Sequence, residues 1–238
     1  MLRNPRDSAG AVTPDTPVET PERTDELPAE GPGTAAKAPV RKRPKPGERR
    51  IQILQVLAGM LEQPGAERVT TAALAAKLQV SEAALYRHFA SKAQMFEGLI
   101  EFIESSIFQL VNQIAEREQA AGDAGAGARH CAKVVAMVLQ FAEKNPGMTR
   151  VMVGDALVFE NERLQQRMNQ FFDKIEATLR QGLRTSADAE GSATPTVDAQ
   201  VLASALTAFM VGRLHRFARS GFKRSPTEHL EASLAVLL

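Results

Sequence analysis

Apolar residues recur at helical spacing from residue 47 to the end of the chain. In the first segment Ile51, Leu54, Leu57 and Leu61 fall at intervals near 3.6 residues, and the same period continues in later segments. No stretch of useful length alternates apolar and polar residues with the two-residue period of a strand. The pattern predicts an all-α fold of about nine helices. Their expected ranges are 47–63, 71–78, 81–89, 91–119, 129–144, 148–153, 155–183, 197–219 and 226–238.

Two of the expected helices, 71–78 and 81–89, are short and are joined by a two-residue turn. An amphipathic helix precedes them and a much longer one follows, which is the arrangement of a helix-turn-helix. Leu85 and Phe89 are four residues apart and therefore point to the same, inward side of the second short helix. If this helix enters the major groove of DNA, its opposite side meets base edges and phosphates. That side carries Glu82, Ala83, Tyr86 and Arg87.

Hydroxyl and basic residues flank the two short helices. Two threonines open the first short helix, and a serine and a lysine open the long helix that follows, at N-termini that favour anions. The basic run RKRPKPGERR leads directly into the first helix, where its last two arginines can follow a DNA backbone or enter a minor groove. The residues predicted to contact DNA are Arg49, Arg50, Thr70, Thr71, Ser81, Glu82, Ala83, Tyr86, Arg87, Ser91 and Lys92.

An alternative interpretation of this region stays open. A short helix with exposed tyrosine, arginine and histidine also occurs on all-α proteins that bind no DNA, and a basic run is also typical of a solvated linker. Glu82 is an awkward residue for a surface that faces DNA, since a carboxylate repels phosphate. It fits there only if it accepts a hydrogen bond from a cytosine amino group or orients Arg87.

The first 46 residues differ in composition from the rest of the chain. They hold nine of the 13 prolines and no aromatic residue, with eight Lys/Arg against seven Asp/Glu. Such a segment buries too little apolar surface to offset the entropy of ordering it. We therefore expect a disordered, proline-rich tail (1–46), a helix-turn-helix DNA-binding domain (47–92) and a C-terminal helical domain for dimerisation and partner binding (93–238).

Composition also bears on location and reactivity. The chain is 44% hydrophobic with a net charge of +1, so it can form a core and is not a uniformly basic nucleic-acid binder. It has no run of 18 apolar residues and no apolar stretch at its start, so we expect a cytoplasmic protein without a membrane partner. The single cysteine, Cys131, lies in an apolar run and is expected to be a buried, unreactive thiol.

Nothing in the sequence points to an enzyme, a metal site or a cofactor. The four histidines, His88, His130, His215 and His229, are dispersed and have no metal-ligand spacing. The glycines of AAGDAGAGA (120–128) do not form a phosphate loop, because no strand precedes them. We expect a flexible connection at this segment.

The stretch RVTTAALAAKLQVSEAALYRHFASKAQMFEGLIEF resembles the N-terminal DNA-binding domain of the TetR family. The shared elements are TTAALA, the VS turn, LYRHF and the SK that opens the long helix, and the resemblance covers residues 47 to about 95. It implies a TetR-like fold, in which a three-helix helix-turn-helix domain is followed by a helical dimerisation domain. A single short helix reads few base pairs, so specificity needs two copies about 34 Å apart on the DNA.

Most of the chain after residue 50 is similar to the members of that family that act in nucleoid occlusion. The stretches concerned are EAALYRHFASKAQMFEGLIEFIE, FAEKNPGMTRVMVGDALVFENERLQQRMNQFFDKIEA and FKRSPTEH. The resemblance implies a homodimer that binds palindromic chromosomal sites on the nucleoid, takes no small-molecule ligand, and inhibits assembly of the division protein FtsZ into a ring. It also implies that FtsZ binds between the long helix and the next one, on a partner surface of Phe102, Met137, Gln140, Lys144 and Asn145. Leu110 and Gln140 depart from the expected pattern there, where a basic residue and a glycine are usual.

A second function stays open, that of a ligand-responsive TetR-type transcriptional repressor. Such a repressor needs a pocket with apolar walls and a few convergent polar groups, which a sequence does not reveal. The apolar stripe of 197–217 and the last helix, ASLAVLL, suit a four-helix dimer seam, although an intramolecular core explains part of the stripe as well.

Overall fold

The structure, a computed structural model, describes residues 47–63, 69–121 and 125–238. The expected disordered tail lies outside the described residues, as does the middle of the expected flexible connection. The described residues form nine α-helices, one short 3-10 helix and no strand, which confirms the prediction of an all-α fold. The elements are α1 (Glu48–Leu61), α2 (Thr71–Leu78), α3 (Glu82–Tyr86), α4 (Lys92–Ala121), α5 (Ala126–Lys144), α6 (Pro146–Met152), η2 (Asp155–Leu157), α7 (Glu162–Ala189), α8 (Pro195–Arg219) and α9 (Leu230–Leu237).

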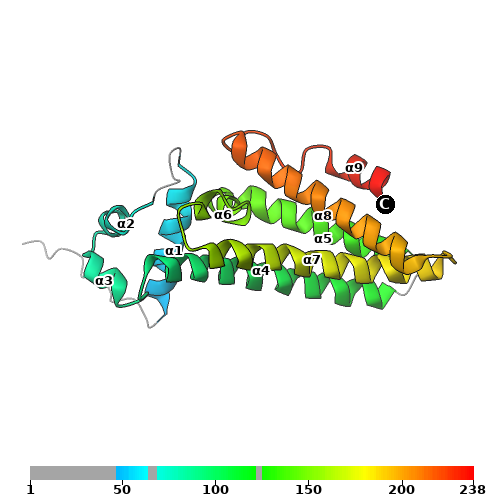
Figure 1. Cartoon of the computed structure of the whole chain (residues 1–238), viewed down its shortest axis with the longest axis horizontal. Helices are drawn as coiled ribbons and strands as arrows, with labels where there is room; N and C mark the ends of the chain where they lie inside the picture. The colour runs from blue at the N-terminus through cyan, green and yellow to red at the C-terminus, as the bar shows by residue number, and fades with distance from the viewer. Residues whose placement is uncertain (1–46, 64–68, 122–124) are drawn as a thin grey trace, which may run out of the picture. The chain divides into compact units, whose positions relative to one another are not determined.

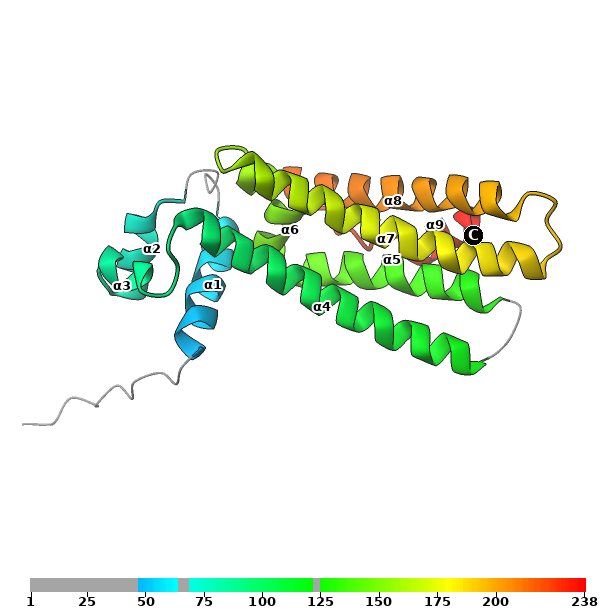
Figure 2. The ribbon, with the colours of Figure 1, turned by 60° about the horizontal axis from the view of Figure 1, so that its bottom comes forward.

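Three short elements gather at one end of a long helical bundle (Figures 1 and 2). α1, α2 and α3 form this head, while α4, α5, α7 and α8 run side by side away from it, with α7 and α8 as an antiparallel hairpin. α4 belongs to both parts. Phe96 and Ile100 are buried near its start, and Ile107 and Val111 are buried further along it. The boundary expected at residues 92 and 93 therefore falls at the start of a continuous helix and remains a prediction.

Local sequence determines how the two short helices of the head begin and end. The side chains of Thr70 and Ser81 accept hydrogen bonds from the backbone N–H groups three residues further on, at 3.1 and 3.3 Å, and so cap α2 and α3. Gln79 ends α2 in a left-handed conformation with φ 55°. Leu85 and Phe89 are buried, as the helical spacing predicts.

The start of α7 differs from the prediction. The helix expected from residue 155 begins at Glu162. Gly154 adopts φ 83° and residues 155–157 form the separate 3-10 helix η2. Asn161 then caps α7, because its side-chain oxygen accepts from the backbone N–H of Arg163 at 3.0 Å.

Three further boundaries were predicted wrongly. α7 continues to Ala189 instead of ending near residue 183. The helix expected over 81–89 ends at Tyr86, and the following residues complete only a turn. The last helix begins at Leu230 instead of near residue 226. The hydroxyls of Ser225 and Thr227 donate to the Glu143 carboxylate of α5, which holds the intervening segment as a loop.

α6 packs against α1 at a distance that only glycine permits. A Cβ atom on Gly147 would lie 1.9 Å from the carbonyl oxygen of Ala58. Gly147 is the second residue of α6, directly after Pro146, whose fixed φ suits the first position of a helix. The contact joins the first helix of the head to the helical bundle, so it helps to position the head.

The single cysteine is buried in α5, as predicted. The Sγ of Cys131 donates to the carbonyl oxygen of Leu179 on α7 at 3.3 Å. Burial raises the pKa of the Cys131 thiol to about 12, so the reactive thiolate is scarce at neutral pH.

Within the described part of the chain, α8 is long and apolar enough to cross a membrane by length and composition alone. The core helices of soluble proteins can have the same length and composition. Ala203, Leu206, Met210 and Leu214 of α8 are fully buried against the rest of the protein, so the feature is weak evidence for a membrane span.

We predict that Gly147→Ala destabilises the fold, because its methyl group would collide with the backbone of α1. Overpacking of this kind costs about 1–3 kcal/mol, measurable as a lower midpoint of urea unfolding. Gly59→Ala is the matched control, since a Cβ at Gly59 in α1 meets nothing within 4 Å. Replacing this open helical glycine should stabilise the protein by about 0.5–1 kcal/mol. Equal midpoints for the two variants would contradict the prediction.

Candidate nucleic-acid interface

One side of α3 faces solvent and carries the four side chains expected to read DNA. Glu82, Ala83, Tyr86 and Arg87 are all exposed, whereas Leu85, on the other side of the helix, is buried. Tyr86, the chain's single tyrosine, is 45% exposed. Among the described residues, these four side chains are therefore open to solvent.

Three of the four hydroxyl residues predicted to contact DNA cap helices. Thr70 and Ser81 cap α2 and α3, and the Ser91 oxygen accepts from the backbone N–H of Gln94 at the start of α4. In each case the hydroxyl oxygen is the acceptor, so its proton remains available to a phosphate oxygen. These residues can therefore contact DNA without giving up their structural role.

Glu82 has a partner that the sequence did not suggest. Its carboxylate accepts a hydrogen bond from the Thr71 hydroxyl at 2.6 Å, which ties the start of α3 to the start of α2. The contact gives Glu82 a structural role within the helix-turn-helix. It also engages the Thr71 hydroxyl that was expected to reach a phosphate.

The two arginines at the start of α1 differ in their contacts. Arg50 donates to the backbone oxygen of His88 at 2.9 Å, and its guanidinium lies 4.2 Å above the ring of Phe89. It therefore holds α1 against the end of α3. Arg49 donates to the Gln52 side chain at 2.6 Å, one turn along the same helix.

Lys92, at the start of α4, is engaged in an ion pair. Its Nζ lies 2.5 Å from a carboxylate oxygen of Glu160, in the segment between η2 and α7. The Glu160 side chain is only 10% exposed and that of Lys92 is 30% exposed. If Lys92 contacts a phosphate, as the sequence predicts, Glu160 would compete with that phosphate for the same ammonium group.

The residues of the expected partner surface lie on two adjacent helices. Phe102 and Leu110 are exposed on α4 and lie two turns apart on one side of it. Gln140 and Lys144 are exposed and Met137 is half-buried on α5, which packs against α4 (Figure 2). The arrangement forms two neighbouring stripes, one on each helix.

Asn145 differs from the rest of the partner surface because it also has a structural role. It links α5 to α6, and its side-chain nitrogen donates to the carbonyl oxygen of Phe141 at 2.7 Å. Its own carbonyl oxygen accepts from the hydroxyl of Thr149. A substitution at Asn145 would therefore disturb the α5–α6 junction as well as any partner contact.

No group of three or more His, Cys, Asp or Glu side chains within the described residues is placed to hold a metal ion.

Two family models match this chain, and between them they cover the head and most of the bundle. Residues 53–99 match the model described as bacterial regulatory proteins, tetR family. Residues 129–238 match the model described as tetracyclin repressor-like, C-terminal domain. The fold and these matches define a regulatory protein of the TetR type.

Curated relatives narrow the assignment. The nucleoid occlusion factor SlmA of Vibrio vulnificus (strain YJ016) is 50% identical over 194 residues, which cover 81% of this chain and 95% of that protein. The factor of the same name from Photobacterium profundum is 51% identical over 188 residues, which cover 79% and 92%. The chain belongs to the family of SlmA nucleoid occlusion factors. Since this is a family of regulators, the chain is not an enzyme.

Solved structures agree on the fold. The TetR-family regulator PfmR from Thermus thermophilus superposes with a TM-score of 0.63 at 20% identity, covering 79% of this chain and 97% of that one. The repressor NalD of Pseudomonas aeruginosa gives a TM-score of 0.62 at 18% identity, covering 80% and 95%. At this level of identity the likeness concerns the fold alone.

The sequence reasoning missed the residues that join the head to the bundle. Glu160 follows Lys92 by 68 positions, so no local pattern links the two residues. Gly147 falls between the helices expected over 129–144 and 148–153, and it is the site of closest approach to α1. The Pro-Gly pair was the only signal available for that contact.

We predict that Glu160→Gln strengthens DNA binding, because the amide no longer competes with phosphate for Lys92. The gain should be up to about fivefold, the range of a partly exposed ion pair. The salt dependence should steepen by about one phosphate contact. Both are measured by fluorescence anisotropy with a labelled duplex at several salt concentrations.

Glu162→Gln is the control for that experiment. It removes the same charge at an exposed position two residues after Glu160. Unchanged or weaker binding by Glu160→Gln, relative to this control, would show that Lys92 does not reach DNA.

Proposed function

We propose that the chain is a sequence-specific DNA-binding homodimer that acts as a nucleoid occlusion factor. Bound to palindromic sites, it inhibits FtsZ ring assembly over the chromosome, and it resides in the cytoplasm on the nucleoid. The observation that carries the proposal is the 50% identity to SlmA factors over 95% of their length, which includes the head and the bundle together. The fold alone would support only a TetR-type regulator.

The exposed side of α3 supports the DNA-binding part of the proposal. Tyr86 and Arg87 face solvent at the end of this helix, where a guanidinium can pair with guanine and a hydroxyl can reach a phosphate. Ala83 is small enough to allow a close approach to the groove. In this proposal Arg50 supports α3, and Lys92 becomes a phosphate contact once Glu160 releases it.

An unpartnered stripe on α8 supports the homodimer. Val197 and Val201 are 59% and 65% exposed, and the stripe continues along the same side through Ala205, Ala208 and Gly212. A Cβ at Gly212 would meet nothing within 4 Å, so this side of α8 is open to a second helix. Leu206 and Met210, on the other side of α8, belong to the intramolecular core.

The partner surface supports the FtsZ part of the proposal. Phe102 offers an exposed aromatic ring on α4, and Lys144 offers a charge on the neighbouring helix α5. An apolar anchor beside a charge is typical of the central residues of protein–protein interfaces. Both lie on long helices that also hold the core, so the surface is rigid.

We predict that Lys144→Asp leaves DNA binding intact and abolishes inhibition of FtsZ polymers. Reversing a charge at a protein interface weakens binding about tenfold or more, because an attractive contact becomes repulsive. The measurement is sedimentation of purified FtsZ polymers with the protein, with and without a duplex that carries its site.

Arg163→Asp is the matched control, as it makes the same charge reversal at an exposed position on α7. Normal inhibition by Lys144→Asp would contradict the assignment of the partner surface. Loss of DNA binding in the same variant would instead indicate a structural role for Lys144.

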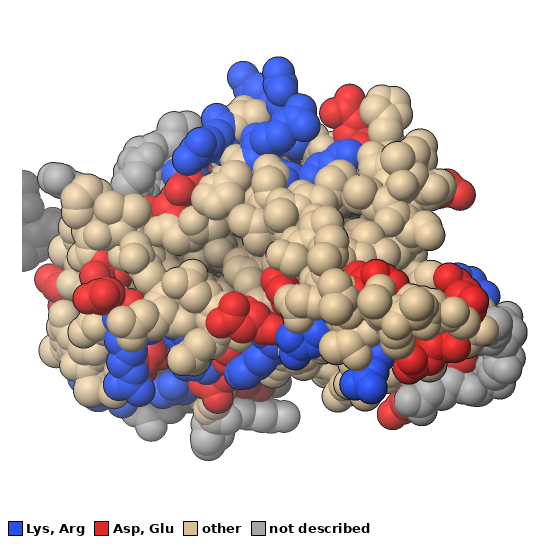
Figure 3. Space-filling model, turned by 45° about the vertical axis from the view of Figure 1, so that its right-hand side comes forward, with Lys and Arg blue, Asp and Glu red and all other residues tan. Residues whose placement is uncertain are grey.

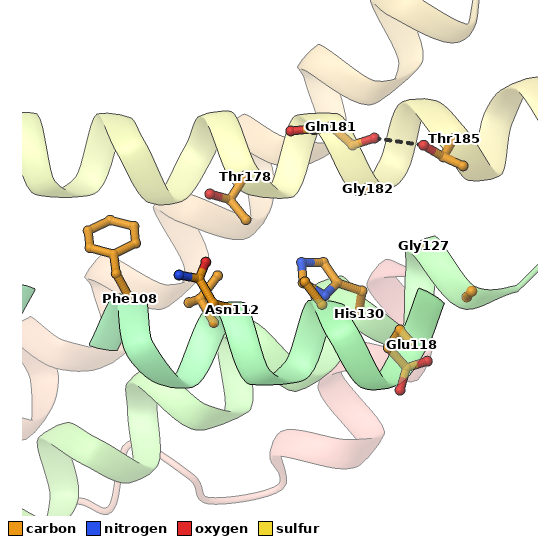
Figure 4. Close-up of a pocket in the computed structure, with 12 residues that line it drawn as sticks. Phe108, Asn112, Glu118, Gly127, His130, Thr178, Gln181, Gly182 and Thr185 are labelled. Atoms are coloured by element: carbon orange, nitrogen blue, oxygen red, sulfur yellow. Dashed lines mark hydrogen bonds between the residues drawn. The ribbon is translucent and has the colours of Figure 1, made fainter. Parts of the chain in front are cut away.

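A cavity between α4, α5 and α7 favours a second candidate function, the ligand-responsive repressor (Figure 4). Its volume is about 490 Å³, within the range usual for small-molecule sites. Phe108 and Asn112 of α4 and Thr178 and Gln181 of α7 contribute to its walls. Apolar and polar groups therefore line the same space.

His130 of α5 is the polar group that this cavity leaves unsatisfied. The residue is 8% exposed, and its Nδ1 has no hydrogen-bond partner. Burial lowers the pKa of His130, so the imidazole is neutral at neutral pH. Leaving a buried nitrogen unpaired costs about 1–3 kcal/mol, which a ligand hydroxyl or amide would offset. The chemistry fits a small, largely apolar molecule with one uncharged polar group.

If the cavity is a ligand site, the protein purified from its host under native conditions retains a small molecule, seen as added mass in native mass spectrometry. His130→Phe should lose that mass, because it removes the polar group and fills the space. Thr207→Val is the control, as it removes another buried, unpaired side-chain group that is remote from the lining. Absence of added mass, together with binding sites scattered over the chromosome, would leave nucleoid occlusion as the function.

A further inference from the structure

A group of basic side chains lies where α8 ends and the loop to α9 begins. Four of them are exposed within nine residues, and we call them the basic cluster: Arg216, Arg219, Lys223 and Arg224. Among the ion pairs between described residues, none involves a member of the cluster. Figure 3 shows Lys and Arg side chains gathered at the top of the molecule, the height at which Figure 1 draws the end of α8.

The backbone that carries the cluster is held in place at its start. The Ser220 hydroxyl oxygen accepts from the backbone N–H groups of Lys223 and Arg224 at 3.1 and 2.9 Å. Phe222 adopts φ 65° and packs its ring against Phe217, with 5.2 Å between the ring centroids. The loop therefore turns sharply over a buried aromatic ring and directs Lys223 and Arg224 outward.

The far side of the loop is held as well. Ser225 and Thr227 donate to the Glu143 carboxylate on α5. Arg213 donates to the backbone oxygens of Pro226 and Glu228, so this arginine braces the loop. The cluster is thus presented from a fixed backbone, which reduces the entropy lost when a ligand binds.

The helix dipole explains only half of the cluster. Arg216 and Arg219 lie in the last turn of α8, where a positive charge contributes about 0.3–1 kcal/mol. Lys223 and Arg224 lie beyond the helix and gain nothing from its dipole. The whole chain has a net charge of +1, so four unpaired cations in nine residues are a strong local excess. Their mutual repulsion is relieved by a bound polyanion.

The surroundings of the cluster indicate the kind of polyanion. Partner proteins and membranes are usually held by exposed apolar anchors as well as by charge. The exposed large hydrophobic residues of the described chain include none between 202 and 235. Three of the four cations are arginines, whose planar guanidinium matches phosphate oxygens two at a time. A purely charged, arginine-rich surface fits a phosphodiester backbone.

We propose that the basic cluster is a second DNA-binding surface, which holds the backbone of a DNA segment other than the one read by α3. α1 and α6 lie between α3 and the end of α8 in both ribbon views (Figures 1 and 2). A duplex seated on α3 therefore leaves the cluster free. One protein molecule then joins two stretches of DNA, one by sequence and one by charge.

The test is a bridging assay with the full chain. A duplex that carries the protein's palindromic site, obtained by selection in vitro, is fixed to beads. A fluorescent duplex of unrelated sequence is then captured through the bound protein. The cluster variant combines Arg216→Ala, Arg219→Ala, Lys223→Ala and Arg224→Ala. We expect it to occupy the beads as the unchanged protein does and to capture at least tenfold less fluorescent duplex.

Two further variants make the outcome unambiguous. Arg216→Lys with Arg219→Lys and Arg224→Lys keeps the charge and should retain most of the capture, which separates charge from folding. The double variant Tyr86→Ala with Arg87→Ala should instead no longer bind the palindrome on the beads. It should still bind free duplex weakly through the basic cluster. If this helix variant still occupies the palindrome, the proposed reading by α3 fails and the basic cluster is unaffected.

Salt gives an independent measure. If the cluster neutralises four phosphates, the logarithm of the affinity for the fluorescent duplex should fall linearly with the logarithm of the salt concentration, with a slope of about −3.6. Capture by the cluster variant equal to that of the unchanged protein would overturn the proposal. If the cluster variant captured as much duplex as the unchanged protein but no longer bound phosphatidylglycerol vesicles, the basic cluster would be assigned to a membrane surface instead.

Discussion

The close approach of α6 to α1 at Gly147 is the constraint on which the arrangement of this protein depends. A methyl group there would overlap the carbonyl oxygen of Ala58, so the two helices meet backbone to backbone. Two other links act beside it. α4 runs unbroken from the head into the bundle, and Lys92 at its start pairs with Glu160. The head is therefore held against the bundle at three separate places, through α1 and the start of α4.

Several residues that the sequence predicts to contact DNA also hold the head together. Arg50 braces the end of α3, the Thr71 hydroxyl bonds to Glu82, and Lys92 is paired with Glu160. Glu82, Tyr86 and Arg87 remain exposed on the outer side of α3. The contacts around α3 determine how firmly and in which orientation the helix is presented.

The sequence predicts the helices well because their apolar residues repeat with a strong period. It places Leu85 and Phe89 in the core and the four α3 residues on the surface, since one turn of a helix determines both. It misplaces the start of α7, because the turn over residues 155–157 has helical composition and only the cap at Asn161 marks the true beginning. Four basic residues lie between 216 and 224 in the sequence, and the structure adds that all four are exposed beside a loop in which Phe222 packs on Phe217.

Contacts between distant segments lie beyond what periodicity can predict. The Nδ1 of His130 has no hydrogen-bond partner, and it lines the cavity between α4, α5 and α7. No local residue pattern predicts that cavity. Glu160 and Gly147 are similar cases, since each acts through a residue far away in the chain. The family resemblance predicts the partner surface, but it does not predict the contacts that Lys92 makes with Glu160 and Asn145 with Phe141.

The unbroken course of α4 has a mechanical consequence. Its 30 residues extend for about 45 Å, with Lys92 at one end, Phe102 about 15 Å along and Glu118 beside the cavity about 39 Å along. A tilt of about 5° about its start would displace the far end by roughly 4 Å, more than a bond length. Any change in the direction of α4 at Lys92 would therefore move the residues beside the cavity further than it moves Phe102.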